Sequence, residues 1–232
     1  MKKLLLFILP LMAFTFNACS KDDDGDELGG STKLVKTLTV DDDTHAFIYD
    51  SENRIKSVTC KHISYSYQYQ GNTVIGTPTV YDPSFVQNYE HYTLNDAGKL
   101  MKFEEKDSDG EVLSSIQYTY GSDGYVSKSV SDYGIINYTW HNGNLVTISD
   151  GNTTHTITYN DVENKIGSLW VDLPEDLMNL YGQLKGMSPK NYPIAITGSN
   201  SNTFTYTFDK DGYPTEIITK GAFTEKRVYT YQ

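Results

Sequence analysis

The chain has 232 residues, a formal net charge of -11 and a pI of about 4.8. This acidic balance argues against a nucleic-acid partner, which needs a basic face, and it favours solubility. Tyr occurs 19 times and Phe 9 times, so aromatic rings must supply much of the area that any core buries.

The first 18 residues have the pattern of a signal peptide. Two lysines precede an apolar run from Leu4 to Phe16, and the small residue Ala18 stands directly before Cys19. As a helix this run would reach only about 20 Å, against about 30 Å for the hydrocarbon core of a bilayer. We therefore expect residues 1–18 to be a cleaved leader.

The sequence around the cleavage point resembles the lipobox of bacterial lipoproteins, in which the new N-terminal cysteine carries acyl chains. Cys19 would then hold the protein to the outer membrane. The residues that follow resemble the export tag of surface-exposed Bacteroidetes lipoproteins, which implies a place at the cell surface. This tag consists of Ser20, Lys21, Asp22, Asp23 and Asp24. The alternative for Cys19 is a free or disulfide-bonded thiol after an ordinary secretory signal.

Residues 19–32 predict a tether, and residues 33–232 predict a single domain. The tether is acidic and rich in glycine, so it cannot bury apolar surface and should stay extended and flexible. If Cys19 is acylated, Cys60 is the only other cysteine and no intramolecular disulfide can form. Cys60 lies in a strand-like run, where we expect it to be a small apolar filler.

One phrase then recurs along the chain at intervals of roughly 20 to 26 residues, which is the signature of a repeat architecture. It begins with two aromatic or apolar residues separated by one residue, most often threonine, and it continues through a turn into a more polar segment. The copies are FIYDSENRIKSV from residue 47, HYTLNDAGKLMKF from 91, QYTYGSDGYVSKS from 117, NYTWHNGNLVTI from 137, TITYNDVENKIGSL from 156 and YTFDKDGYPTEI from 206.

Each copy predicts a β-hairpin. Alternate residues of a strand point to the same face, so the two rings share one face and the threonine between them takes the other. The Asp, Asn and Gly residues that follow suit a tight turn with positive φ. The chain should therefore be an all-β antiparallel meander of about 14–16 short strands. Because twist accumulates across a wide sheet, we expect it to curl into a barrel or half-barrel around the rings.

The stretch YDSENRI, from residue 49, resembles the tyrosine-aspartate (YD) repeat of Rhs-type shells. The whole chain after residue 33 is similar to a family of Bacteroidetes lipoproteins classed as a domain of unknown function with a porin-like fold. LKGMSPKNYP, residues 184–193, resembles the Lys-Asn-x-Pro segment of that family. The resemblance implies the fold and the envelope location, and it brings no activity.

The composition of the strands predicts a barrel that stands in water. A lipid-facing band needs apolar residues at alternate positions of every strand. Lys102, Lys128, Lys165 and Glu216 interrupt the return strands, and the ring faces oppose Thr and Ser. We therefore do not expect the strands to cross the membrane.

The repeat is interrupted once, where a helix is predicted over about 173–186. Asp172 can cap it, and Leu173, Leu177, Leu180 and Leu184 recur at helical spacing. Such a helix would plug the barrel mouth or cover an open sheet face. The alternative is a lid over a ligand pocket. Trp170, Tyr181 and Tyr192 would line this pocket, and Trp140 and Trp170, with the tyrosines of the repeat, are candidates for stacking on a sugar.

Motifs for chemistry are weak in this sequence. The Asp-Gly loops lack the full spacing of a calcium-binding EF-hand, and the histidines show no metal-ligand spacing. There is no nucleophile elbow and no phosphate-binding loop. We predict no catalytic residue, no metal and no cofactor.

The leading functional hypothesis is a non-catalytic, lipid-anchored surface module, a monomer, that binds a glycan or an envelope protein. Exposed rings could stack on sugars, although the same rings could instead form the core. One alternative is a carrier that holds a small apolar ligand inside the curved sheet. A second alternative is a hydrolase that uses acidic residues at one sheet rim.

Overall fold

The structure is a computed structural model that describes residues 33–84, 88–167, 188–199 and 201–232. Lys33–Gln232 forms one compact unit, and its described residues form a succession of short strands. The strands are β1 (Val35–Val40), β2 (Asp43–Tyr49), β3 (Ile55–Thr59), β4 (Ile63–Gln70), β5 (Thr73–Val80), β6 (Tyr89–Leu94), β7 (Leu100–Lys106), β8 (Val112–Tyr120), β9 (Val126–Ser131), β10 (Gly134–His141), β11 (Asn144–Ser149), β12 (Thr154–Glu163), β13 (Asn191–Thr197), β14 (Asn202–Phe208), β15 (Pro214–Lys220) and β16 (Thr224–Tyr231).

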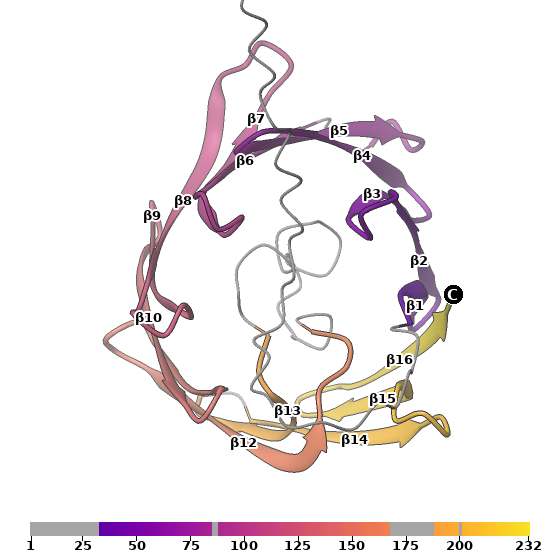
Figure 1. Cartoon of the computed structure of the whole chain (residues 1–232), viewed down its shortest axis with the longest axis vertical. Helices are drawn as coiled ribbons and strands as arrows, with labels where there is room; N and C mark the ends of the chain where they lie inside the picture. The colour runs from indigo at the N-terminus through magenta and orange to yellow at the C-terminus, as the bar shows by residue number, and fades with distance from the viewer. Residues whose placement is uncertain (1–32, 85–87, 168–187, 200) are drawn as a thin grey trace, which may run out of the picture. The chain divides into compact units, whose positions relative to one another are not determined.

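These strands close into a barrel (Figure 1). Each strand pairs antiparallel with the next one along the chain, and β1 pairs with β16 to complete the ring. At this seam Thr37 lies opposite Thr230, and Val40 lies opposite Arg227. The predicted all-β meander is therefore confirmed, and of the two predicted forms the closed barrel is the one observed.

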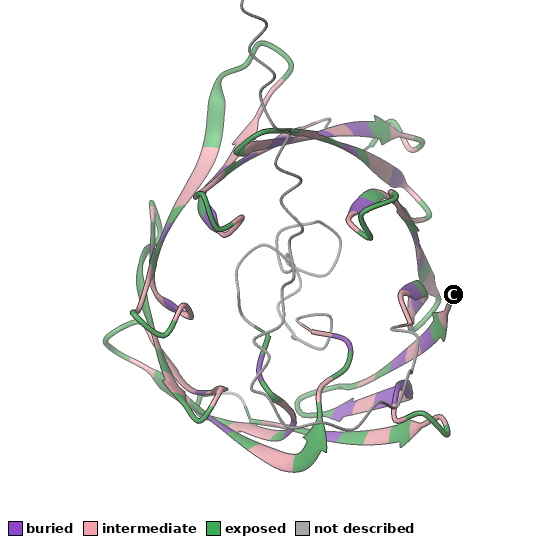
Figure 2. Cartoon of the chain, in the orientation of Figure 1, coloured by how far each residue is buried: buried purple, intermediate pink, exposed green. Residues whose placement is uncertain are grey.

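Most aromatic residues of the repeated strands line the inner face of the barrel. Buried positions alternate with more exposed ones along strands such as β15 and β16 (Figure 2). Several turns curl into the ring in Figure 1. Arg54, in the turn between β2 and β3, has its guanidinium 4.1 Å from the ring centre of Tyr69 on β4. Since that turn curls inward, the Tyr69 face of the sheet is the inner one.

The outer face is polar. At the seam the hydroxyl oxygens of Thr37 and Thr230 lie 2.6 Å apart, and those of Thr39 and Thr44 are separated by 2.9 Å. These pairs are exposed and lie on the face opposite the rings. The barrel thus places its main apolar cluster inside and many of its threonines outside, although apolar residues such as Ile48 and Val130 are also exposed.

Side-chain acceptors build the turns that curl inward. The Oδ1 atom of Asp50 accepts hydrogen bonds from the backbone N–H groups of Glu52 and Arg54, at 2.9 and 3.0 Å. Asn95 and Asp209 accept the equivalent pairs in the turns that follow β6 and β14. In these three turns the first residue is Asp or Asn because its side chain takes the place of a backbone acceptor within the turn.

A β-bulge precedes most of these turns. The extra residue bends the strand and increases its twist, so the turn is directed toward the barrel interior. The register shifts lie at Ile48/Tyr49, Thr93/Leu94, Thr119/Tyr120, Thr139/Trp140 and Thr207/Phe208.

The predicted helix over about 173–186 lies outside the described residues. The part of the chain that the structure describes contains no helix with the length and hydropathy of a membrane span.

Candidate functional site: the aromatic belt of the inner face

Seven aromatic side chains of the described strands form a belt near one rim of the barrel, here called the aromatic belt. Each lies in the second half of an even-numbered strand. Its hydroxyl or indole N–H donates a hydrogen bond to a backbone carbonyl near the start of the preceding strand. The donors, with acceptor residues and distances, are Tyr49 (Val35, 2.9 Å), Tyr69 (Ile55, 2.8 Å), Tyr120 (Leu100, 2.6 Å), Trp140 (Val126, 2.8 Å), Tyr159 (Leu145, 2.7 Å), Tyr206 (Pro193, 2.6 Å) and Tyr231 (Pro214, 2.6 Å).

The residue before the acceptor carbonyl covers the ring in several of these contacts. Arg54 covers Tyr69 at 4.1 Å, and the Lys99 ammonium lies 5.5 Å from the ring centre of Tyr120. A cation held over an aromatic face is attracted by the ring quadrupole. Each such ring is thus held at its polar end by a hydrogen bond and over its face by a side chain of the neighbouring repeat.

Two of the predicted ligand-contact residues lie in or beside this belt. Trp140 is half-buried and stacks on Tyr125, with ring centres 4.3 Å apart and planes at 16°. Tyr192 is fully buried, and its ring lies 5.1 Å from that of Tyr206. Its hydroxyl accepts a hydrogen bond from the backbone N–H of Lys165 at 2.9 Å. Both rings are therefore packed into the barrel wall.

The other predicted site residues lie outside the described residues. These are Trp170 and Tyr181, the lipidation residue Cys19, and the export tag from Ser20 to Asp24. Their roles remain predictions.

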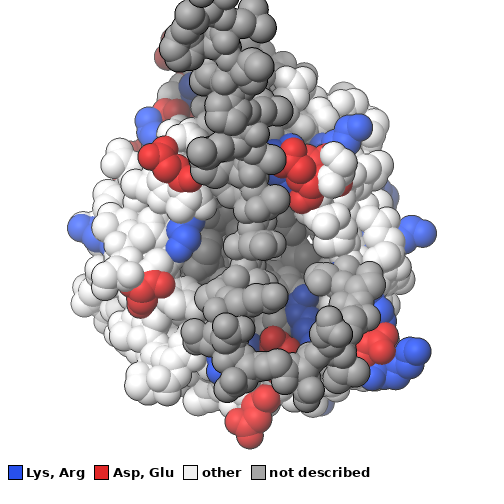
Figure 3. Space-filling model, in the orientation of Figure 1, with Lys and Arg blue, Asp and Glu red and all other residues white. Residues whose placement is uncertain are grey.

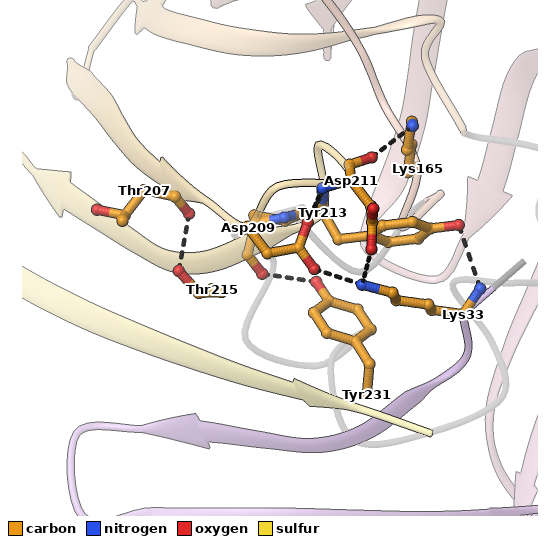
Figure 4. Close-up of polar contacts among 9 residues, drawn as sticks. Lys33, Lys165, Thr207, Asp209, Asp211, Tyr213, Thr215 and Tyr231 are labelled. Carbon is orange, nitrogen blue, oxygen red and sulfur yellow. Dashed lines mark hydrogen bonds and ion pairs between the residues drawn. The ribbon is translucent and has the colours of Figure 1, made fainter. Parts of the chain in front are cut away.

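An ionic and aromatic cluster ties the seam of the barrel together (Figure 4). The Lys33 ammonium lies 2.7 Å from Asp209 and 2.6 Å from Asp211, in the turn between β14 and β15. The backbone N–H of Lys33 donates to the hydroxyl of Tyr213 at 3.1 Å, and the ring of Tyr213 meets that of Tyr231 edge-on at 5.2 Å. Hydrogen bonds to the two carboxylates raise the pKa of Lys33 above its ordinary value. The cluster connects the segment before β1 to β15 and β16.

The inner face also carries a buried carboxylate. Glu90 on β6 is 5 % exposed and accepts a hydrogen bond from the hydroxyl of Tyr92 at 2.5 Å. It lies beside Gly76 on β5, which in turn lies beside Tyr67 on β4. A Cβ at Gly76 would come within 2.8 Å of Glu90 and 2.9 Å of Tyr67, so the glycine makes room for both side chains.

Glu90 also bears on the hydrolase hypothesis. It lies directly opposite Glu105 on β7, which accepts a hydrogen bond from the Asn88 amide at 2.6 Å. Other carboxylates that the structure describes, such as Asp50 and Asp209, are engaged as acceptors in turns. Glu90 and Glu105 therefore have structural partners of their own. No group of three or more His, Cys, Asp or Glu side chains within the described ranges is arranged to hold a metal ion.

The hydrogen bonds of the aromatic belt were not predicted from the sequence. A signal for them exists, because the donor follows the acceptor by 14 residues for Tyr49, Tyr69, Trp140 and Tyr159. This spacing is the length of one hairpin and marks four of the seven contacts, while Tyr206, Tyr231 and Tyr120 follow their acceptors by 13, 17 and 20 residues.

Comparison with known proteins supports the fold alone. Neither the scan of protein-family models nor the comparison with curated proteins gives a match. Among solved structures, a porin-like protein from Bacteroides uniformis superposes with a TM-score of 0.67 at 17% sequence identity, covering 87% of this chain and 99% of that one. The two proteins share a fold.

A second solved structure, the Photorhabdus luminescens Tc holotoxin pore, matches with a TM-score of 0.24 at 15% identity. The match covers 79% of this chain and 8% of that one. The similarity is too low to support any inference about this protein.

Removing one hydroxyl of the belt should destabilise the barrel. Tyr120→Phe leaves the Leu100 carbonyl without its donor, and we expect it to lower the free energy of unfolding by about 1 to 2 kcal/mol. The matched control is Tyr81→Phe, because the Tyr81 ring is 57 % exposed and its hydroxyl bonds to the Ser64 hydroxyl at the surface. Urea unfolding followed by circular dichroism measures both. If both variants lose the same free energy of unfolding, the belt hydrogen bond stabilises the protein no more than a hydrogen bond at the surface does.

Alkaline pH should ionise the tyrosines of the aromatic belt and unfold the barrel. Burial raises the pKa of Tyr49 from 10.0 to about 12, and it also raises those of Tyr69, Tyr120 and Tyr159. Because the folded pKa lies above the unfolded one, this stabilisation is complete below pH 10 and is lost as the pH rises toward and beyond 12. Phenolate absorbance and circular dichroism should therefore show buried tyrosines ionising only as the strands unfold. Ionisation of every tyrosine in one step near pH 10, with the fold intact, would contradict this.

Proposed function

We propose that this protein is a non-catalytic, lipid-anchored module of the outer membrane, displayed at the cell surface, where it binds another envelope protein. Acyl chains on Cys19 would hold it to the membrane, and residues 19–32 would act as the tether. The barrel would stand in water as a monomer. Its shared fold with a porin-like Bacteroides protein is compatible with an envelope location.

The observation that carries this proposal is that the inner rings support the barrel wall. The polar atoms of the aromatic belt are bonded to backbone carbonyls. Tyr125 covers one face of the half-buried Trp140 and Tyr192 is fully buried, so little of either ring is left to stack on a pyranose. Such a wall is a scaffold that leaves the outer face and the rims for partners, and it favours a protein partner over a glycan.

The surface charges agree with a protein partner. On the face that Figure 3 shows, the described Lys and Arg residues are interspersed with Asp and Glu. The net charge of -11 opposes binding to nucleic acid. Surfaces of mixed charge select their partners through local complementarity.

One observation favours the carrier alternative. The inner face is rich in rings that are only partly buried, among them Tyr65, Tyr138 and Tyr206. An apolar ligand could contact such a face. A carrier would keep its ligand through purification, which gives a direct way to distinguish the two functions.

The test uses the full-length chain purified in detergent from its own host. We expect a pull-down from the envelope fraction to enrich one protein, which then binds the purified chain in a reconstituted assay with micromolar affinity, roughly -8 kcal/mol. We expect a glycan array to give no signal and native mass spectrometry to show the mass of the chain with its acyl groups. Cys19→Ser should release the protein from the membrane fraction.

A co-purifying apolar molecule would favour the carrier. Binding to a glycan, with no protein partner captured, would show that the ligand of this module is a glycan. Turnover of any substrate would show that the protein is an enzyme. Retention of Cys19→Ser in the membrane fraction would contradict the lipid anchor.

A further inference from the structure

The β7–β8 hairpin projects beyond the ring of strands (Figure 1). β8 pairs with β7 from Val112 onward, but its ladder with β9 begins only at Ile116. The edge of Val112–Ser115 that faces away from β7 is not paired with any described strand. This part of β8 is therefore an open strand edge, although the sheet as a whole closes into a barrel.

Other described strands also extend past the ladder with one neighbour, among them β4, β5, β10, β12 and β14. β5 continues beyond its ladder with β6 from residue 77 onward, but it carries Pro78, which has no N–H to donate. β10 extends past β11 only over Gly134–Ile136. The β8 edge is longer than that of β10 and contains neither proline nor charge, so it lacks the usual guards of an edge.

The side chains at the β8 edge are exposed and apolar. Val112 is 49% exposed and Leu113 is 51% exposed. They are adjacent in the strand and so point toward opposite faces of the hairpin. The turn between β9 and β10 lies just past the end of the β9 ladder, and its Tyr133 is 96% exposed. A strand added to this edge would find apolar contacts at Val112 and Leu113 and, at the other end of the edge, near Tyr133.

The β7–β8 hairpin carries a net negative charge, which favours a basic binding partner. Five carboxylates and two lysines lie between Lys102 and Ser115, and Asp107, Asp109 and Glu111 form the exposed tip. Both lysines, Lys102 and Lys106, lie near Glu104 and are partly neutralised by it. The hairpin is therefore acidic, and a second copy of this chain, itself at -11, would be repelled.

We propose that Val112–Ser115 is a strand-addition site for an extended segment of a partner protein, apolar at its centre and flanked by lysine or arginine. Main-chain hydrogen bonds to the β8 edge supply the affinity, and the basic flanks pair with the acidic tip. This inference rests on the proposed function and names the class of partner segment that the module binds.

The probe is a fluorescein-labelled peptide of about seven residues, with valine and threonine at its centre and lysines at both ends. We expect the full-length protein to bind it at micromolar concentration and hydrogen exchange to slow at Val112–Ser115. The same peptide with alternate backbone amides methylated should lose about tenfold or more in affinity, because it cannot complete the ladder. A peptide with glutamate in place of lysine should also bind more weakly.

Leu113→Lys places a charge on the open edge and should weaken binding of the lysine peptide about tenfold or more. The matched control is Val130→Lys. Val130 is 39% exposed, and its strand is paired on both sides, with Gln117 and with Ile135. We expect this variant to bind the peptide within about twofold of the parent. Circular dichroism should show the same strand content for both variants.

The site assignment is overturned if the peptide fails to bind at about millimolar concentration, if both variants bind it equally, or if exchange slows elsewhere. These outcomes differ from failure of the proposed function. If Leu113→Lys still captures the envelope protein, the module binds its partner through another surface. If the parent protein captures no envelope protein, the proposed function itself is wrong.

Discussion

The fold depends on satisfying the polar atoms of its inner rings. A phenol or indole buried without a partner would be costly, and a wide barrel has too few aliphatic side chains here to fill its inner face alone. The chain resolves both needs at once, because the rings bury area while their polar ends bind carbonyls such as those of Leu100 and Val126. Each bond joins an even-numbered strand to the one before it, so the belt ties the two strands of each such pair together.

The same constraint shapes the functional surfaces. Rings directed inward leave Thr and Lys on the outer face, and turns drawn inward by bulges narrow one rim. A wall of this kind can be stable without help from its surface, which is then free to vary for binding. The surface that stands out is the β7–β8 hairpin, whose open edge is the kind of feature that barrels normally remove.

The sequence was sufficient for the hairpin repeat and the turns, because alternation and turn chemistry act within a few residues. Tyr118 and Tyr120 had to share a face, and Asn95 had to mark a turn. Whether the sheet closes fully into a barrel could not be predicted from the sequence, because closure depends on the twist summed over all strands and on the pairing of β1 with β16. The packing of Trp140 and Tyr192 was equally inaccessible, because their covering residues come from other hairpins.

The most direct test of this account is a cross-link at the seam. In a Cys60→Ser background, Thr37→Cys with Thr230→Cys should form a disulfide under mild oxidation, because these residues are paired across β1 and β16 on the exposed face. Thr39→Cys with Thr44→Cys, within the first hairpin, is the positive control. We predict that both pairs oxidise without loss of strand content. If only the control pair oxidises, β1 and β16 are not paired and the sheet is open.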